Sequence, residues 1–394
     1  MAGAAVASGL SAGITQTLAV AQEVSGAKPR QARIADVQVW PFTIQEKGTF
    51  RIALGSESAA ENVLVRLRTA DGAVGWGESS PYSPVTSETQ ATNVAIARSF
   101  ADFIRGCDPF SIPKIVSDMD AFAPGSPGIK AAFEMALWDI CGKLSGQPVC
   151  RVLGKYRDSF PTDLTVFLDT PAAMAESAKR VASRGFKAIK VKVGEVPELD
   201  IERLRNIRGA VGDSVALRID ANQGWSPADA IRALKALEPL RIEFCEQPIP
   251  YSDWEGLKFV RRHSPVPIMA DESVHSPQDA IEAVRRDACD MINIKLMKSG
   301  GILKAMRIAH IADAADMQCM LGCMSETRLG LTAAAHVVAA CRSVLYVDLD
   351  AFDFLQTDPI IGGMDVTDGV IRLPAKPGLG LDVDPEFVKA LRPA

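Results

Sequence analysis

From about Thr162 onward, short apolar runs alternate with amphipathic segments along the chain. Each run suits one buried strand, and each segment between runs has the apolar spacing of a helix. The runs centre on Thr165–Phe167, Ile189–Val193, Leu217–Ile219, Ile242–Cys245, Ile268–Ala270, Ile292–Leu296, Met317–Leu321 and Leu345–Val347. Strands that alternate with helices in this way predict a parallel α/β barrel.

The chain before this repeat has a different pattern. Alternating apolar residues between 32 and 80 predict antiparallel strands, with a hairpin turn at Asp71-Gly72. A polar stretch from Thr43 to Glu61 is expected to be a long functional loop between the first two strands. Apolar residues at helical spacing between 87 and 146 predict helices. We therefore expect an α+β domain over residues 29–155, a barrel over 156–356, and a tail over 357–394 that packs back on the first domain.

Length and charge narrow the class of protein. A chain of 394 residues exceeds one small core, which is consistent with two domains. A net charge of -5 argues against nucleic acid or an anionic membrane surface as a partner. No apolar run suits a membrane-spanning helix. The eight cysteines are scattered without a metal-type Cys-x-x-Cys, so we expect buried free thiols.

Residues 1–28 are set apart by composition. Residues 1–27 contain no Lys or Arg and are rich in Ala, Gly, Ser and Thr, and Ala19-Val20-Ala21 matches the small-x-small pattern of a leader cleavage site. The apolar stretch from Ala2 to Leu10 resembles a twin-arginine export leader without its arginines. The alternative is a disordered tail on a cytoplasmic protein. The balance favours a periplasmic location, because export in the folded state is compatible with free thiols.

Three carboxylates stand at the ends of three successive apolar runs. Asp220, Glu246 and Asp271 recur at intervals of about 25 residues, the length of one strand, one helix and two short loops. Lys192 and Lys295 end the flanking runs at similar intervals. Because the strand ends of a parallel barrel converge on one mouth, we expect all five side chains to meet there.

Such a group of acids calls for a cation. Carboxylates in one place repel one another unless a positive charge neutralises them. Oxygen ligands without His or Cys select Mg²⁺, or Mn²⁺, over Zn²⁺. The other explanation, a separate Arg or Lys partner for each acid, fits any single acid better than three at a matched interval. We therefore expect one Mg²⁺ per subunit. Lys190 faces the same mouth as Lys192, because side chains alternate along a strand.

The residues around these positions form a set of motifs. They are Lys190-x-Lys192, Asp220-Ala-Asn-Gln-Gly, Glu246-Gln-Pro, Ala270-Asp-Glu-Ser and Asn293-Ile-Lys. In order and spacing this set resembles the muconate-lactonizing subgroup of the enolase superfamily, from about residue 32 to about residue 385. The resemblance implies a modified (β/α)₇β barrel with an α+β capping domain. It also implies Mg²⁺ on the three acids and acid–base roles for Lys192 and Lys295.

A further motif narrows the reaction, since this subgroup hosts cycloisomerases, synthases, racemases and epimerases. Asp348-Leu-Asp350 resembles the Asp-x-Asp of dipeptide epimerases, and Gly322–Gly330 resembles their seventh-strand loop. The resemblance implies that Asp348 and Asp350 hold the α-ammonium of a dipeptide. Two carboxylates on one strand face suit an ammonium group where water is excluded. The other explanation is a salt-bridged or capping pair.

The implied reaction inverts the α-carbon next to the C-terminal carboxylate of a dipeptide. One lysine removes the α-proton, an enediolate forms, and the other lysine returns a proton. Lys190 would disfavour protonation of Lys192 by its like charge. Asn222 and Glu272 are expected to orient the ligands or the lysines.

Substrate choice is expected to depend on the segment Phe50–Ser58, which would close over the site. Gly55 stands where Ala-Glu epimerases carry an arginine, so an Ala-Glu substrate is in doubt. Glu57 would favour a cationic side chain if it faces the substrate. Ser325, in the seventh-strand loop, would leave room for a bulkier substrate.

Other functions remain open at this point. An N-acylamino acid racemase, a succinylbenzoate-type synthase or a cycloisomerase would use the same fold. A metal-free Schiff-base aldolase would use Lys192 or Lys295 as a nucleophile. A catalytically silent binding protein is disfavoured because all five mouth residues are retained. We expect a small-molecule partner and a homo-oligomer.

Overall fold

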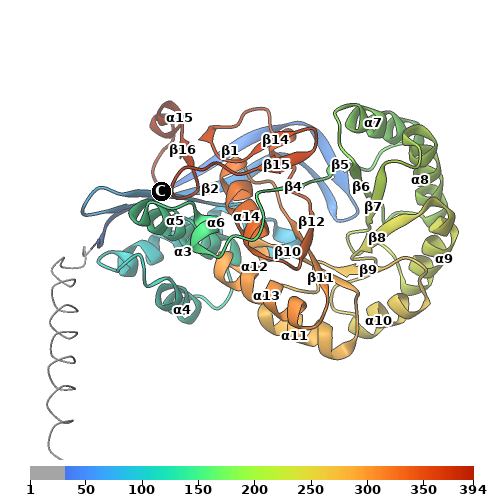
Figure 1. The fold of residues 1–394 in the computed structure, drawn as a ribbon, viewed down its shortest axis with the longest axis horizontal. Helices are drawn as coiled ribbons and strands as arrows, with labels where there is room; N and C mark the ends of the chain where they lie inside the picture. Colours follow the sequence, from blue (N-terminus) through green and yellow to red (C-terminus); the bar gives the residue numbers. More distant parts are fainter. Residues whose placement is uncertain (1–31) are drawn as a thin grey trace, which may run out of the picture.

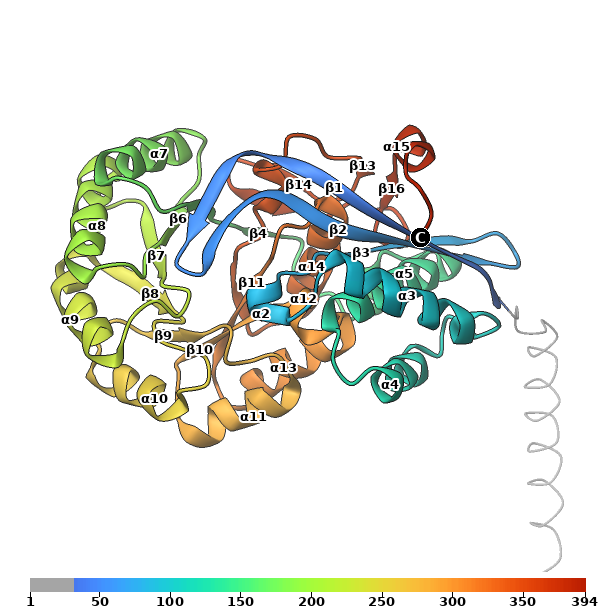
Figure 2. The same cartoon turned by 180° about the vertical axis from the view of Figure 1, so that it is seen from behind.

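A computed structural model describes residues 32–394, so the expected leader in residues 1–28 lies outside the described residues. Two regions lie side by side (Figures 1 and 2). One contains a long antiparallel hairpin and a group of helices, and the other is an arc of helices around curled parallel strands.

The first region is an antiparallel sheet packed against helices. Its strands are β1 (Ile34–Ile52), β2 (Gly55–Thr69) and β3 (Val74–Ser79), in that order in the sheet. Its helices are α2 (Ser83–Thr86), α3 (Gln90–Ile104), α4 (Ile112–Phe122), α5 (Pro127–Ser145) and α6 (Val149–Val152). Helix α5 lies directly on β3, because a Cβ at Gly77 would fall 1.8 Å from the carbonyl oxygen of Ala132. The expected turn at Asp71-Gly72 joins β2 to β3.

The expected loop from Thr43 to Glu61 is wrong. This segment forms paired strands of β1 and β2. The pairing runs from Thr43 opposite Glu61 to Ile52 opposite Gly55, with a register shift between Gln45 and Phe50. Exposed polar residues alternate there with inward positions such as the buried Ile44, Glu46 and Ala60, so polar composition concealed a period of two. We call residues 43–61 the hairpin. Figure 2 shows it reaching over the parallel strands.

The second region is the parallel barrel. Eight strands follow one another in chain order around the sheet: β5 (Leu164–Val166), β6 (Ala188–Lys192), β7 (Ala216–Asp220), β8 (Ile242–Glu246), β9 (Ile268–Ala270), β10 (Met291–Lys295), β11 (Gln318–Gly322) and β12 (Val344–Val347). The backbone N–H of Asp163 donates to the carbonyl of Val347 at 3.2 Å, which joins the two edges of the sheet.

Helices connect these strands on the outside. They are α7 (Pro171–Ser183), α8 (Pro197–Val211), α9 (Pro227–Leu237) with η1 (Glu238–Leu240), α10 (Trp254–His263), α11 (Pro277–Arg286), α12 (Leu296–Ser299), α13 (Ile302–Ala314) and α14 (Arg328–Ala340). After β12 only the short η2 (Ala351–Asp353) follows before the chain leaves the barrel. The predicted (β/α)₇β barrel with an α+β capping domain is therefore confirmed.

Large apolar side chains fill the interior of the barrel at the end opposite its mouth. They are Phe244, Met269, Met291, Met320 and the partly buried Tyr346, which we call the apolar plug. Each stands at an inward position of its strand, one or two pleats before the strand ends at the mouth. The plug leaves the opposite, carboxyl end of the strands for polar side chains.

The C-terminal segment packs against both regions. It contains β13 (Ile360–Gly362), β14 (Asp365–Thr367), β15 (Val370–Arg372), β16 (Leu381–Val383) and α15 (Pro385–Ala390). Strand β15 pairs with β4 (Ser159–Pro161) beside the barrel. The indole N–H of Trp76 donates to Asp382 at 2.7 Å, which ties this segment to the antiparallel sheet. Within residues 32–394, no helix has the length and apolarity needed to cross a membrane.

Candidate active site

The carboxyl ends of β6, β7 and β8 bring four charged residues together. Lys190 and Lys192 are inward residues of β6, and Asp220 and Glu246 are the last residues of β7 and β8. Lys192 is the sheet partner of Asp220, which in turn is the partner of Glu246. The ammonium of Lys190 lies 3.1 Å from Asp220 and 2.8 Å from Glu246. That of Lys192 lies 2.7 Å from Asp220.

The ends of β9 and β10 add two more charged residues, and we call the six together the charged ring. Asp271 follows β9 directly, and Lys295 is the last residue of β10. The Lys295 ammonium lies 2.8 Å from one carboxylate oxygen of Asp271, and the fully buried Lys298 contacts the other at 2.5 Å. Lys298 also donates to the backbone carbonyl of Val274 at 3.0 Å. Asp271 is therefore held between two lysines.

The pKa values of the acids follow from this arrangement. Burial alone would raise the pKa of Asp220, but the ammonium groups of Lys192 and Lys190 outweigh it and lower that pKa to about 2. Lys295 and Lys298 likewise lower the pKa of Asp271 against the effect of burial. Burial and the charge of Asp220 raise the pKa of Glu246 to about 8. The charged ring is a coupled set of charges.

The donor set fits a hard divalent cation. Oε2 of Glu246 and both carboxylate oxygens of Asp271 are buried without a hydrogen bond of regular geometry, and only ammonium groups face them. Six carboxylate oxygens from three strand ends, without His or Cys, are the ligands that Mg²⁺ and Mn²⁺ prefer.

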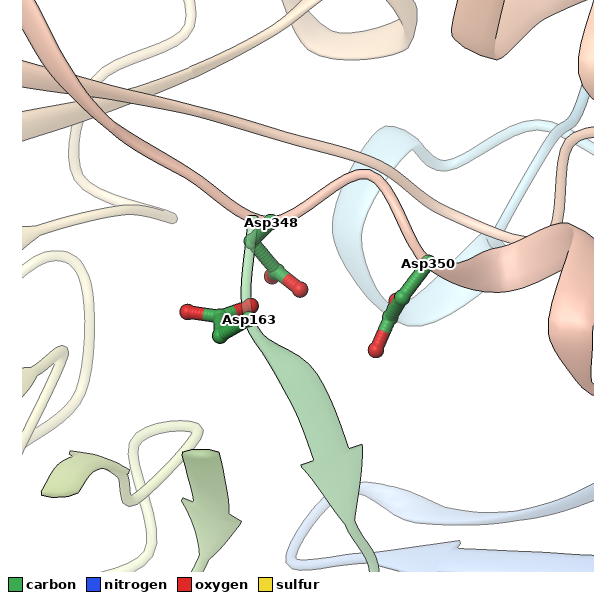
Figure 3. A group of neighbouring side chains, drawn as sticks. All are labelled: Asp163, Asp348 and Asp350. Atoms are coloured by element: carbon green, nitrogen blue, oxygen red, sulfur yellow. The ribbon is translucent and has the colours of Figure 1, made fainter. Parts of the chain in front are cut away.

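A second acidic group lies on the other side of the barrel interior (Figure 3). Asp163 precedes β5, and Asp348 and Asp350 follow β12; oxygens of these three buried residues all lie within 4.8 Å of one another. Arg218 contacts Asp163 at 2.7 Å, and Lys190 contacts Asp348 at 2.7 Å. Among the described residues, this is the group of three acids whose oxygens lie that close together. Asp220, Glu246 and Asp271 do not form such a group, and lysine ammonium groups contact each of them.

Two cations face the three acids of this group, so one acid retains a proton easily. Burial and the charge of Asp348 raise the pKa of Asp350 to about 7. Asp350 also accepts the backbone N–H of Thr165 at 2.7 Å. Burial also lies behind a raised pKa at Asp163, whereas Lys190 lowers the pKa of Asp348 against the effect of burial. The two acids expected to hold a substrate ammonium therefore already have partners. Asp348 pairs with Lys190, and Asp350 accepts the backbone N–H of Thr165.

An open cavity lies between the hairpin and the barrel mouth. Side chains from both regions line it, among them both expected acid–base lysines, Lys192 and Lys295. The expected specificity residues Gly55, Glu57 and Ser325 line it as well. The cavity is thus the place where a substrate would meet both the lysines and the hairpin.

The two orienting residues also lie at the mouth. The backbone N–H of Asn222 donates to Asp220 at 2.9 Å, and its side chain donates to Glu272 at 3.4 Å. Asn222 has a φ of 39°, a left-handed conformation that Asn tolerates better than most residues. Burial, followed by the charges of Asp271 and Asp220, raises the pKa of Glu272 to about 7.

Several residues at the site were not predicted from the sequence. Lys298 follows Lys295 by one helical turn, and Asp163 precedes β5 in the same inward alternation as Thr165. Arg218 is two residues before Asp220 on the same strand face. Their spacing could have indicated them. Glu46 could not have been found this way, because its strand was predicted as a loop.

Two family profiles match this chain. Residues 34–154 match the N-terminal domain of mandelate racemase and muconate lactonizing enzyme. Residues 173–387 match the enolase C-terminal domain-like family. The chain belongs to the enolase superfamily. The predicted resemblance is therefore confirmed.

The curated relatives and solved structures that match this chain include dipeptide epimerases. A hydrophobic dipeptide epimerase from Enterococcus faecalis is 42% identical over 89% of this chain and 99% of its own length. An L-Ala-D/L-Glu epimerase from Clostridium acetobutylicum is 40% identical over 89% of this chain and 98% of its own length. The structure of a dipeptide epimerase from Cytophaga hutchinsonii, complexed with Mg and D-Ala-L-Val, has a TM-score of 0.90 at 39% identity, covering 92% of this chain and 99% of that one.

Proposed function

We propose that this protein is a Mg²⁺-dependent dipeptide epimerase that inverts the α-carbon next to the C-terminal carboxylate. One observation carries the proposal. Lys192 and Lys295 line the same cavity from β6 and β10, which three other strands separate in the sheet. A lysine on each side of a substrate is the arrangement that inversion by two proton transfers needs. Relatives solved with Mg and a dipeptide support the choice of substrate.

Asp220, Glu246 and Asp271 would hold the cation. When bound, Mg²⁺ would act as a Lewis acid toward the substrate carboxylate and so make the α-proton more acidic. Asn222 would keep Asp220 in place through its backbone N–H. Lys298 would do the same for Asp271 on the side away from the cavity.

Each catalytic lysine must lose its proton to act as a base. Burial lowers the pKa of Lys295, but the charge of Asp271 outweighs this and raises it above its ordinary value. A carboxylate whose charge is neutralised no longer raises that pKa. Neutral Lys295 would then remove the α-proton on one face of the α-carbon, and the ammonium of Lys192 would donate a different proton on the other face. The α-carbanion is delocalised into the carboxylate as an enediolate.

Asp348 and Asp350 would receive the α-ammonium of the N-terminal residue. Asp350 borders the cavity and is the more available of the two to a substrate ammonium. It accepts a backbone N–H but has no ion pair among the described residues. The ion pair between Asp348 and Lys190 favours a second candidate, an N-acylamino acid racemase, because an acylated nitrogen needs no anionic partner.

Exchange of the α-proton with solvent deuterium tests the proposal. Wild-type protein with Mg²⁺ should exchange and invert free dipeptides. Lys192→Ala and Lys295→Ala should each abolish inversion, while Lys187→Ala, an exposed lysine next to β6, should retain it. If both active-site variants inverted dipeptides at the normal rate, the two-base scheme would be wrong.

Two further measurements separate the alternatives. Faster inversion of N-acetyl or N-succinyl amino acids than of any free dipeptide would favour the racemase. A covalent adduct trapped by borohydride, with activity that resists a chelator, would favour the Schiff-base aldolase.

A further inference from the structure

Two acids of the hairpin face the active-site cavity without a basic partner. Glu46 is only 7% exposed, and its Oε2 is buried with no hydrogen bond. Its other oxygen accepts from the Ser325 hydroxyl at 3.5 Å. Glu57 is half-buried on the facing strand and lines the same cavity. Neither carboxylate forms an ion pair with any described Lys or Arg.

The basic residues nearest in sequence are engaged elsewhere. Lys47 donates to the carbonyl of Asp353 at 2.6 Å, and Arg51 pairs with Glu195 at 3.4 Å. Gly55, at the tip of the hairpin, has no side chain that could neutralise the acids. The two carboxylates are thus left for a charge that comes from outside the described chain.

These two acids are costly to bury without a counter-charge. Burial raises the pKa of Glu57 to about 7, and the neighbouring charge of Glu46 adds to the rise. Burial also raises the pKa of Glu46, although the Ser325 hydroxyl opposes it. A cation between the two carboxylates would relieve both the desolvation and the repulsion.

The cavity beside these acids has an apolar wall. Phe50 packs against Phe167 at 4.4 Å and against Phe354 at 5.0 Å between ring centroids, and all three line the cavity. Such a wall suits the methylene stem of a long side chain whose charged end reaches the acids.

We infer that Glu46 and Glu57 form a subsite for the cationic side chain, lysine or arginine, of the residue that is inverted. This inference rests on the proposed epimerase function. Tyr82 relates the subsite to the catalytic lysine, because it lines the same cavity as Glu57 and Lys295 and the charges of both act on its hydroxyl. The inverted residue, which must lie against Lys295, therefore carries the side chain that reaches Glu57.

Substrate comparison at fixed Mg²⁺ tests this subsite. L-Ala-L-Lys and L-Ala-L-norleucine have side chains of similar length, and only the first is charged. We expect kcat/KM to be higher for Ala-Lys by about tenfold or more, the usual range for a charge-assisted hydrogen bond. Glu46→Gln and Glu57→Gln should each lower this ratio. Glu176→Gln, which removes an exposed acid of α7, should leave the ratio unchanged.

The outcomes separate this inference from the proposed function. If no dipeptide undergoes α-proton exchange, the proposed function fails. If dipeptides exchange but Ala-norleucine, Ala-Glu or Lys-Ala matches Ala-Lys, the function stands and the subsite is overturned. An unchanged ratio in Glu57→Gln also overturns it. Should Glu46→Gln fail to fold, Glu57→Gln carries the test, because position 57 is only half-buried.

Discussion

The ammonium of Lys190 on β6 lies 2.7 Å from the carboxylate of Asp348, which follows β12 on the far side of the single intervening strand β5. The same ammonium lies 2.8 Å from Glu246 at the end of β8. One buried lysine thus connects the acid proposed to hold the substrate ammonium with an acid proposed to hold the metal. A change at either acid is therefore felt at the other.

Removal of this lysine should destabilise the fold. Lys190→Met leaves Asp348, Glu246 and Asp220 without their shared counter-charge, and losing one partner of a buried ion pair typically costs about 3–5 kcal/mol. The free energy of unfolding from denaturant titration measures the effect. Adding Asp348→Asn to Lys190→Met should recover part of the loss, because one uncompensated charge disappears. Unchanged stability in Lys190→Met would contradict the central place of this residue.

A glycine on β11 should be needed for the position of Lys295. A Cβ at Gly322 would lie 2.9 Å from the side-chain amide of Asn293 and 3.2 Å from Cε of Lys295. Asn293 cannot move freely, because it donates to Glu246 at 2.6 Å. Gly322→Ala should therefore lower kcat by about tenfold or more, which corresponds to an activation barrier raised by about 1.4 kcal/mol or more.

The control for this substitution is Gly209→Ala in α8, where nothing lies within 4 Å of the added Cβ. It should leave kcat unchanged and stabilise the helix by about 0.5–1 kcal/mol. Equal kcat values for the two variants would show that the β11 glycine has no role in placing the lysine.

The preference for a cationic substrate should depend on pH. Since the pKa of Glu57 is raised to about 7, this acid is neutral below that pH and charged above it. Tyr82, whose pKa burial raises to about 12, stays neutral throughout. The ratio of kcat/KM for Ala-Lys over Ala-norleucine should therefore rise as pH increases from 6 to 8. The ratio cancels the titration of the lysines that both substrates share.

Glu57→Gln provides the check on that profile. Glu46, whose pKa is also raised, and Glu61 are the other acids near position 57. If the variant keeps the wild-type rise, one of these acids or another group causes it, and Glu57 does not bind the cation.

Metal binding should distinguish the two acidic groups. A ligand that binds only the folded state stabilises it by about 2.7 kcal/mol at a hundred times its Kd, so Mg²⁺ should raise Tm and a chelator should reverse the rise. Asp271→Asn should remove this increment, and Asp163→Asn should retain it. The increment, rather than Tm itself, is compared, because either substitution alters a buried ion pair. The opposite result would assign the cation to the group around Asp163.

The barrel and its mouth were predictable because both depend on local periodicity. Strands and helices of similar length recur, so Asp220, Glu246 and Asp271 had to lie at equivalent strand ends. The hairpin was missed because its outward residues are polar and hid the alternation of buried ones. Which cation faces which acid was not predictable, because Lys190 on β6 meets Asp348 after β12 through closure of the sheet rather than through sequence spacing.

The apolar plug has a consequence for how the enzyme would progress toward equilibrium. Phe244 and three methionines fill one end of the barrel, and the active-site cavity lies at the other end, beneath the hairpin. Both epimers of a dipeptide would occupy this same cavity, and each is the product of the other. Accumulating product therefore competes with remaining substrate for the site, so progress curves should slow well before the two epimers reach equilibrium.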